Sequence, residues 1–320
     1  MKKLISIVTP CFNEEGNVEE LYKQIKAVMA KLPQYDYEHV YIDNASTDAT
    51  QTILRRLAAG DHNVKVILNM RNYGVLRSPY HGFMQGRGDA VIIMVSDLQD
   101  PPPLIADFIQ KWEGGFKVAL GQKISSEESL LFYLMRSFYY KTVKRLADVE
   151  LLEHVTGFGL YDREVVEQIR NLDDSYPYVR GLISELGYPV ARIAYRQPNR
   201  TSGITKNNFY ALYDIAMVGL TSHSKVPLRL ATMLGFLMAA FSMLVGAGYF
   251  IYKLCYWNSF SVGVAPLVIG MFVFASVQLF FLGIVGEYIG AIHRQVYKRP
   301  MVIEKERLNF DKPPLPDVNK

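Results

Sequence analysis

The stretch AVIIMVSDLQDPP, residues 90–102, decides the fold of this chain. Its apolar first half has the length of a buried strand. Its second half carries acidic and amide side chains, and two prolines then force a turn into a new helix. Open α/β sheets build ligand sites in this way, at the carboxyl edge of parallel strands. The stretch therefore predicts a buried parallel strand with a ligand site at its end.

Further apolar runs of strand length surround this stretch, at residues 4–8, 39–42, 64–68 and 117–120. Amphipathic helical patterns lie between them, such as the stripe formed by Leu21, Ile25 and Val28. Strands that alternate with helices are joined most simply by right-handed crossovers within one sheet. The pattern predicts an α/β domain with a mostly parallel sheet.

Composition excludes several other classes of protein. The 320 residues carry a net charge of only +4, and the basic residues are scattered among acids, so no nucleic-acid partner is expected. Cys11 and Cys255 fall in different environments, so no disulfide is expected. The six histidines lack the paired spacing of zinc sites.

The composition changes sharply near Pro227. Two long apolar stretches follow, at about 228–254 and 262–287, and each is long enough to cross the hydrocarbon core of a bilayer. Basic residues flank the outer ends of this pair, whereas the turn between the helices, at 253–261, holds a single lysine. The positive-inside rule then places the N-terminal domain and the C-terminus in the cytoplasm.

These patterns divide the chain into four expected parts. Residues 1–208 form a cytoplasmic α/β domain, and residues 209–227 form an interfacial amphipathic helix. Residues 228–292 form a hairpin of two transmembrane helices. Residues 293–320 form a basic, disordered cytoplasmic tail, because prolines and charges dominate its end.

Polar segments follow the first two predicted strands as well. Residues 10–15 and 43–48 reach the same carboxyl edge as Asp97, where a crevice could hold a base and a ribose. A carboxylate at the end of a buried strand needs a cation or a donor, which favours metal binding by Asp97. Asp100 stands before two prolines and is equally well explained as a turn residue or as a metal partner.

These segments resemble the signatures of family-2 glycosyltransferases with a GT-A fold. More narrowly, they resemble the polyprenyl-phosphate glycosyltransferases, which include dolichol-phosphate mannose synthase and the bacterial GtrB-type undecaprenyl-phosphate sugar transferases. The matching segments, in chain order, are PCFNEE at 10–15, DNASTDAT at 43–50, RNYG at 71–74, VSDLQDPP at 95–102, RTSGITK at 200–206 and GEYIG at 286–290. The resemblance covers nearly the whole chain.

The resemblance implies a GT-A domain followed by a transmembrane hairpin, in the bacterial inner membrane. It implies transfer of one sugar from a nucleotide diphosphate-sugar to a polyprenyl phosphate at the cytoplasmic face, with inversion, and leaves a homo-oligomer possible. Asp97 and Gln99 would hold Mg²⁺ or Mn²⁺. Asp97, Arg200 and Lys206 would be catalytic, the latter two by binding phosphate. The substrate-binding residues would be Pro10, Phe12, Glu14, Asp43, Arg71, Gly74, Lys123 and Gly203.

The chain also departs from the family pattern. Val95 replaces the first aspartate of D-x-D, and Asn44 replaces the second acid of D-D, so both changes remove charge. One alternative is therefore a non-catalytic membrane scaffold that only binds a nucleotide sugar. A second is a processive polysaccharide synthase, although such synthases carry a Q-x-x-R-W signature and neither Trp112 nor Trp257 follows an arginine.

Overall fold

The computed structural model describes residues 2–124, 155–172, 179–198, 226–256, 264–296 and 300–310. The chain divides into two compact units. The first comprises Met1–Leu134, Leu151–Asn207 and Lys298–Lys320, and the second comprises Met135–Glu150 and Asn208–Tyr297. The end of the chain therefore belongs to the same unit as its beginning.

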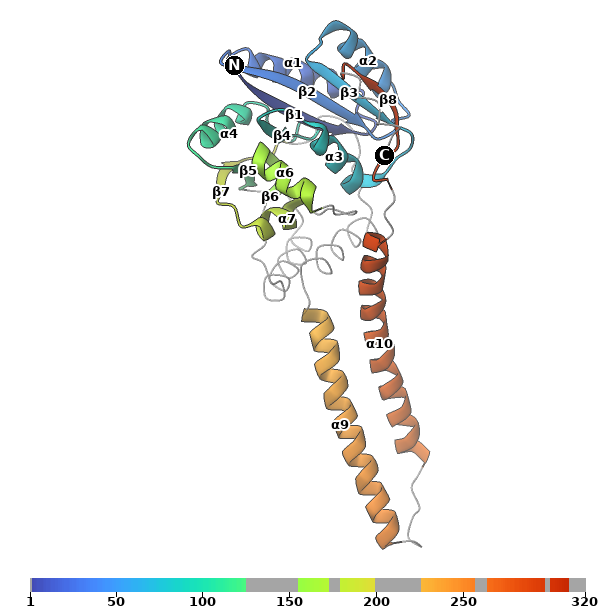
Figure 1. Ribbon diagram of the computed structural model, residues 1–320. Helices are drawn as coiled ribbons and strands as arrows, with labels where there is room; N and C mark the ends of the chain where they lie inside the picture. Colours follow the sequence, from blue (N-terminus) through green and yellow to red (C-terminus); the bar gives the residue numbers. More distant parts are fainter. Residues whose placement is uncertain are drawn as a thin grey trace, which may run out of the picture. The chain divides into compact units, whose positions relative to one another are not determined.

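An eight-stranded mixed sheet forms the centre of the first unit, in the order β7-β5-β6-β4-β1-β2-β3-β8 (Figure 1). The pairs β1–β2, β1–β4, β2–β3 and β5–β7 are parallel, whereas β6 and β8 run antiparallel to their neighbours. The prediction of a mostly parallel sheet is confirmed. The strands are β1 (Lys3–Cys11), β2 (Tyr35–Asp43), β3 (Val64–Asn69), β4 (Ala90–Ile93), β5 (Val118–Lys123), β6 (Val155–Asp162), β7 (Val190–Tyr195) and β8 (Glu304–Leu308).

Helices cover both faces of this sheet. They are α1 (Val18–Met29), α2 (Thr50–Gly60), α3 (Gly74–Gln85), α4 (Leu104–Glu113), α6 (Arg163–Asn171) and α7 (Val179–Leu186). Side chains alternate across a strand, so Ile5 and Ile7 of β1 pack in one core with α1 and α4, while Val8 packs in another with α3, α6 and α7. Burial on both faces explains why the central strands read as continuous apolar runs.

The parallel pairing brings the ends of β1, β2, β3 and β4 to one edge of the sheet. Cys11 at the end of β1 lies beside Asp43 at the end of β2. The segments after these strands, which carry the predicted site residues, therefore start from neighbouring positions.

The expected disordered tail requires a correction. Within it, Glu304–Leu308 forms β8, which pairs antiparallel with β3 at the edge of the sheet. Its sequence, EKERL, is nearly all charged, and charged residues on an edge strand guard it against pairing with other chains. Such a strand has no hydrophobic signature, because only one of its sides meets protein. Residues 311–320 lie outside the described part.

The second unit contains two long apolar helices, α9 (Val226–Cys255) and α10 (Val264–Val296), which contact each other. Each holds a segment long and apolar enough to cross a membrane, Ala231–Gly248 and Val273–Gly290. Their large apolar side chains are exposed; Met243, for example, is 78% accessible. A continuous apolar surface of this extent is typical of lipid-facing helices. Residues 226 and 227 belong to α9, and the rest of the expected interfacial helix lies outside the described residues.

Candidate functional site

The segments after β1 and β2 interlock at the carboxyl edge of the sheet. The backbone N–H of Asn13 donates to Ser46 Oγ at 2.8 Å, and the N–H of Thr47 donates back to Asn13 Oδ1 at 2.8 Å. The N–H of Glu14 donates to Thr50 Oγ1 at 2.9 Å, at the start of α2. The sequence prediction that these two segments meet is confirmed.

Asp43 lies at the base of this junction and is fully buried. Its Oδ2 accepts hydrogen bonds from the Ser46 N–H at 3.0 Å and from Gln51 Nε2 at 2.7 Å. Its Oδ1 is buried without a hydrogen-bond partner among the described residues. Burial raises the pKa of Asp43, against the opposing effect of the Ser46 and Gln51 hydrogen bonds. A buried acceptor of this kind is costly unless a ligand supplies the donor.

Three residues at this edge adopt left-handed backbone conformations that side chains disfavour. They are Asn13 with φ 56°, Ala45 with φ 61° and Leu98 with φ 60°, in the segments after β1, β2 and β4. Asn309 is the fourth such non-glycine residue in the described ranges. Conformations of this type persist where the surrounding structure enforces them, and they gather at functional sites. Their clustering at three neighbouring strand ends supports a ligand site there.

The loop of residues 70–74, called the 70–74 loop below, follows β3. Asn44 holds it in place: Asn44 Nδ2 donates to Asn72 Oδ1 at 3.0 Å and to the Gly74 carbonyl at 3.2 Å. Asn44 Oδ1 accepts from the Tyr73 N–H at 2.8 Å. An aspartate could accept but not donate, so this network explains why asparagine replaces the second acid of D-D.

The 70–74 loop also contains an exposed arginine and a glycine in a left-handed conformation. Arg71 is exposed, lies over the Tyr73 ring with its Cζ 4.2 Å from the ring centroid, and donates from Nη1 to the Asn72 carbonyl at 3.1 Å. Gly74 has φ +84°, a conformation that other residues rarely adopt. The loop therefore presents a cation on a backbone that requires glycine.

We expect Asn44→Asp to displace the 70–74 loop. The new carboxylate would face Asn72 Oδ1 and the Gly74 carbonyl, two acceptors to which it cannot donate, and leaving them unpaired should cost about 1–3 kcal/mol of stability. Thermal unfolding of the purified full chain measures this loss. Asn63→Asp is the matched control, since its side chain holds none of these bonds and lies in an exposed turn. Equal melting temperatures for the two variants would contradict the prediction.

The segment after β4 contains the predicted metal ligands. Asp97 is 7% exposed, and its Oδ1 accepts the Gln99 N–H at 3.2 Å. Asp100 is held differently: its Oδ2 accepts the Val95 N–H and its Oδ1 accepts the Tyr195 hydroxyl, each at 3.2 Å. Burial raises the pKa of Asp100 to about 6. Both oxygens of Asp100 thus serve to hold the turn, which favours the turn interpretation of this residue.

Some of the remaining predicted site residues lie in the described part of the chain, and others lie outside it. Pro10 is in β1, and the Glu14 carboxylate accepts a hydrogen bond from Asn17 Nδ2 at 2.6 Å. Lys123 ends β5, and its Nζ donates to Gln197 Oε1 at 2.6 Å. Phe12 is half-buried after β1. Arg200, Gly203 and Lys206 lie outside the described residues.

Sequence reasoning missed Gln51, Tyr195 and Gln197. Gln51 bonds Asp43 from eight residues away, and Tyr195 bonds Asp100 from 95 residues away. Neither lies in a motif, and Tyr195 ends a strand that the apolar pattern did not reveal. A tyrosine at a strand end was the only signal that could have suggested its role.

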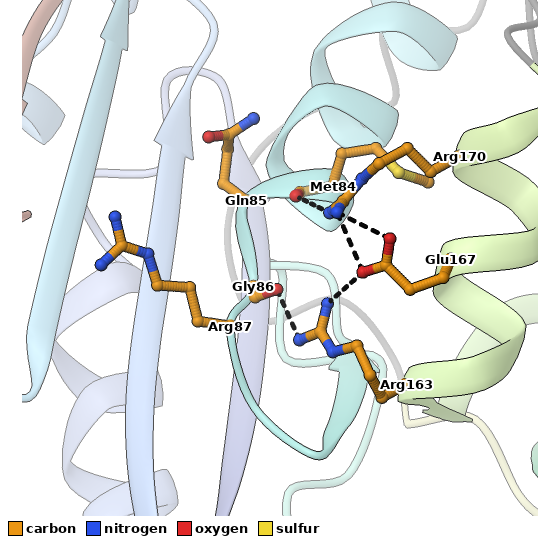
Figure 2. A pocket seen from close by; sticks show the side chains of 7 residues that line it. All are labelled: Met84, Gln85, Gly86, Arg87, Arg163, Glu167 and Arg170. Carbon is orange, nitrogen blue, oxygen red and sulfur yellow. Dashed lines mark hydrogen bonds and ion pairs between the residues drawn. The ribbon is translucent and has the colours of Figure 1, made fainter. Parts of the chain in front are cut away.

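A cavity of about 540 Å³ lies elsewhere, at the start of β4 and beside α6 (Figure 2). Arg163 donates to the Gly86 carbonyl at 2.7 Å, Arg170 donates to the Met84 carbonyl at 2.7 Å, and both arginines pair with Glu167. Arg87 extends away from these groups (Figure 2). Arg163 and Arg170 are thus engaged in joining α6 to the α3–β4 connection, at the edge opposite to the predicted site.

Comparison with known proteins agrees with this architecture. The family described as "Glycosyl transferase family 2" matches residues 6–170. The SfII prophage-derived bactoprenol glucosyl transferase of Shigella flexneri is 34% identical over 303 residues, which are 94% of this chain and 97% of that protein. The prophage bactoprenol glucosyl transferase homolog of Escherichia coli K12 is 31% identical over 302 residues, 94% of this chain and 98% of that protein.

Solved structures are similar at a lower level. Glucosyl-3-phosphoglycerate synthase from Mycobacterium tuberculosis, in complex with phosphoglyceric acid, is 18% identical with a TM-score of 0.48, over 68% of this chain and 78% of that one. The family match spans β1 to α6, the part of the chain that forms the carboxyl-edge site. With this match and relatives aligned along almost their whole length, the chain belongs to glycosyl transferase family 2 and has the GT-A fold of that family.

Proposed function

We propose that this protein transfers a single sugar from a nucleotide diphosphate-sugar to a polyprenyl phosphate. The observation that carries the proposal is the convergence of Asp43, Asp97 and the 70–74 loop at neighbouring strand ends. The names of the Shigella and Escherichia coli relatives, which specify glucosyl transfer and bactoprenol, support a lipid acceptor of this class. The two apolar helices α9 and α10 support a membrane location for the reaction.

The nucleotide-sugar donor would bind at the carboxyl edge of the sheet, with its base at Asp43 and its diphosphate at Arg71. The buried Asp43 Oδ1 is suited to accept an N–H of the base, because the described residues supply no donor to it. Phe12 and Pro10 line the same end of β1. Arg71 is suited to the diphosphate, since its guanidinium is exposed at the 70–74 loop. The proposed substrate-binding set is completed by Glu14, Gly74, Lys123, Arg200, Gly203 and Lys206.

In the proposed reaction, an oxygen of the lipid phosphate attacks the anomeric carbon of the sugar. The bond from that carbon to the diphosphate breaks, and the nucleoside diphosphate leaves with the bonding electrons, so the anomeric centre inverts. The attacking phosphate is already ionised at neutral pH, and no strong general base is needed. The protein has to place two anions in line and offset their charge, which is work for basic side chains and a cation.

Enzymes with the GT-A fold commonly depend on a divalent metal ion, and the residues after β4 fit Mg²⁺ or Mn²⁺. Asp97 supplies a carboxylate that is nearly buried, and Gln99 supplies an amide two residues later. The described residues contain no cluster of three or more acidic, cysteine or histidine ligands. Such a site suits an ion that takes most of its ligands from phosphate and water, as Mg²⁺ does. When bound, the ion would offset the charge of the leaving diphosphate.

The membrane arrangement is part of the proposal. The α9–α10 hairpin would span the inner membrane of a bacterium, with the glycosyltransferase domain and the C-terminus in the cytoplasm. Its support is the excess of basic residues at the outer ends of the hairpin. Strand β8, which follows α10, pairs in the same sheet as β1 to β4. This pairing supports the placement of the C-terminal segment and the glycosyltransferase domain on the same side of the membrane.

Incubation of the purified full chain with radiolabelled UDP-glucose and undecaprenyl phosphate tests the function. We expect label in the organic phase when Mg²⁺ or Mn²⁺ is present, and none when the lipid lacks its phosphate. A panel with UDP- and GDP-linked sugars identifies the donor. Nucleotide binding without any lipid-linked product would instead support a non-catalytic scaffold.

A further inference from the structure

Residues 300–310, called the C-terminal clasp below, are bonded to several other elements of the first unit. At its far end, Asn309 Nδ2 donates to the carbonyls of Ala58 at 2.7 Å and Val64 at 2.8 Å. Glu304 accepts from Arg307 and from His81, whose Nε2 lies 2.5 Å from Glu304 Oε1. These hydrogen bonds lower the pKa of Glu304 to about 2, although burial opposes the shift. The clasp is therefore a built part of the sheet edge.

The near end of the clasp meets the 70–74 loop. The Met70 N–H, at the first residue of that loop, donates to the Ile303 carbonyl at 3.0 Å. Arg77 Nη2, from the first turn of α3, donates to the Pro300 carbonyl at 2.7 Å. The first residue of the 70–74 loop, and the helix turn that follows the loop, are thus each bonded to a segment that lies more than 200 residues further along the chain.

The Arg77 side chain is fixed by a hydrogen bond, by an aromatic ring and by partial burial. Its Cζ lies 5.7 Å from the centroid of the Tyr73 ring, over which Arg71 also lies at 4.2 Å. Its Nε is buried without a hydrogen-bond partner among the described residues. An unpaired buried N–H is unfavourable, so packing must hold the side chain in this orientation. The guanidinium thereby links the Pro300 carbonyl to the ring on which the exposed Arg71 rests.

We propose that Arg77 is a positioning residue for the donor: by joining Pro300 of the C-terminal clasp to Tyr73, it holds Arg71 where the diphosphate binds. This inference rests on the proposed function, because it needs a nucleotide donor at the 70–74 loop. It assigns the clasp a part in donor binding besides completing the sheet.

Donor binding and steady-state kinetics of the full chain test the proposal. UDP and GDP are titrated by calorimetry, with and without Mn²⁺, into the unsubstituted protein, Arg77→Gln, Arg77→Lys and Arg55→Gln. Arg55, in α2, forms an ion pair with Glu306 in the β8 part of the clasp. It serves as the matched control, because it also contacts the clasp but, among the described residues, has no hydrogen bond or ion pair with the 70–74 loop. Because a hydrogen bond from a charged group is lost, we expect about tenfold weaker nucleotide binding for Arg77→Gln. Arg77→Lys, which can still reach the carbonyl, should recover part of the affinity.

The kinetic readout separates positioning from simple destabilisation. We expect Arg77→Gln to raise the donor KM about tenfold with kcat within about twofold, while Arg55→Gln leaves both unchanged. Unaltered nucleotide binding by Arg77→Gln would overturn this inference but leave the proposed function standing. Equal losses in Arg77→Gln and Arg55→Gln would also overturn it, because any weakening of the clasp would then suffice. If the unsubstituted chain binds neither nucleotide, the proposed function fails first, and the inference falls with it.

Discussion

Asp97→Asn should lower kcat for sugar transfer about a hundred- to thousandfold, the usual effect of removing one group that stabilises transition-state charge. Val95 has already removed the other carboxylate of the D-x-D pattern, so Asp97 is the carboxylate on which a metal at this strand end would depend. Asparagine has nearly the same shape and can still accept the Gln99 N–H, so the turn should keep its form. The loss should therefore fall on chemistry rather than on folding.

Two measurements decide this prediction. The first is kcat with lipid phosphate as acceptor. The second is the rise in melting temperature that Mn²⁺ and nucleotide together give the unsubstituted chain, which should disappear in Asp97→Asn. Asp107→Asn, at an exposed carboxylate on α4, is the matched control and should behave as the unsubstituted protein does. Metal-dependent stabilisation that survives in Asp97→Asn would show that the metal ligands lie elsewhere.

Asp43→Asn should weaken nucleotide binding about a hundredfold, since a charge-assisted hydrogen bond to a buried carboxylate is among the stronger single contacts. Asp43 Oδ1 has no partner in the described part of the chain, so the donor base would supply its hydrogen bond. Asparagine can keep a neutral acceptor for Ser46 and Gln51, but it loses the charge. The isothermal titration of UDP and GDP described above measures the change directly.

The pH dependence provides an independent check on Asp43. Burial raises its pKa from the ordinary value of an aspartate. If the ionised form binds the base, protons compete with nucleotide as the pH falls through this raised pKa, and affinity should drop up to tenfold per pH unit below it. Asp43→Asn should lack this dependence. Asp36→Asn, at the exposed opposite end of the same strand, should keep it. An identical pH profile for Asp43→Asn and the unsubstituted chain would refute the assignment.

The parts of the fold that sequence predicted share one property: their signals are local. The strand expected at 90–95 and the stripe of Leu21, Ile25 and Val28 follow from the spacing of neighbouring apolar residues. The local pattern does not reveal β6 or β7, because β6 contains two glycines and β7, at the sheet edge, alternates buried residues with the exposed Arg192 and Ala194. The residues that hold Asp100 and the 70–74 loop escaped for a related reason, since single hydrogen bonds leave no periodic pattern.

The amino-acid order alone settled the α/β class, the two apolar helices and the gathering of polar strand ends at one sheet edge. Each of these features depends on the burial of repeated apolar residues, and that pattern can be recognised from residues that are neighbours in the sequence. Tertiary contacts decided that the end of the chain is a strand and that Asn44 donates where an acid could not. They also decided that Asp100 holds a turn. Each of these depends on a partner distant in sequence, whose position only the folded chain determines.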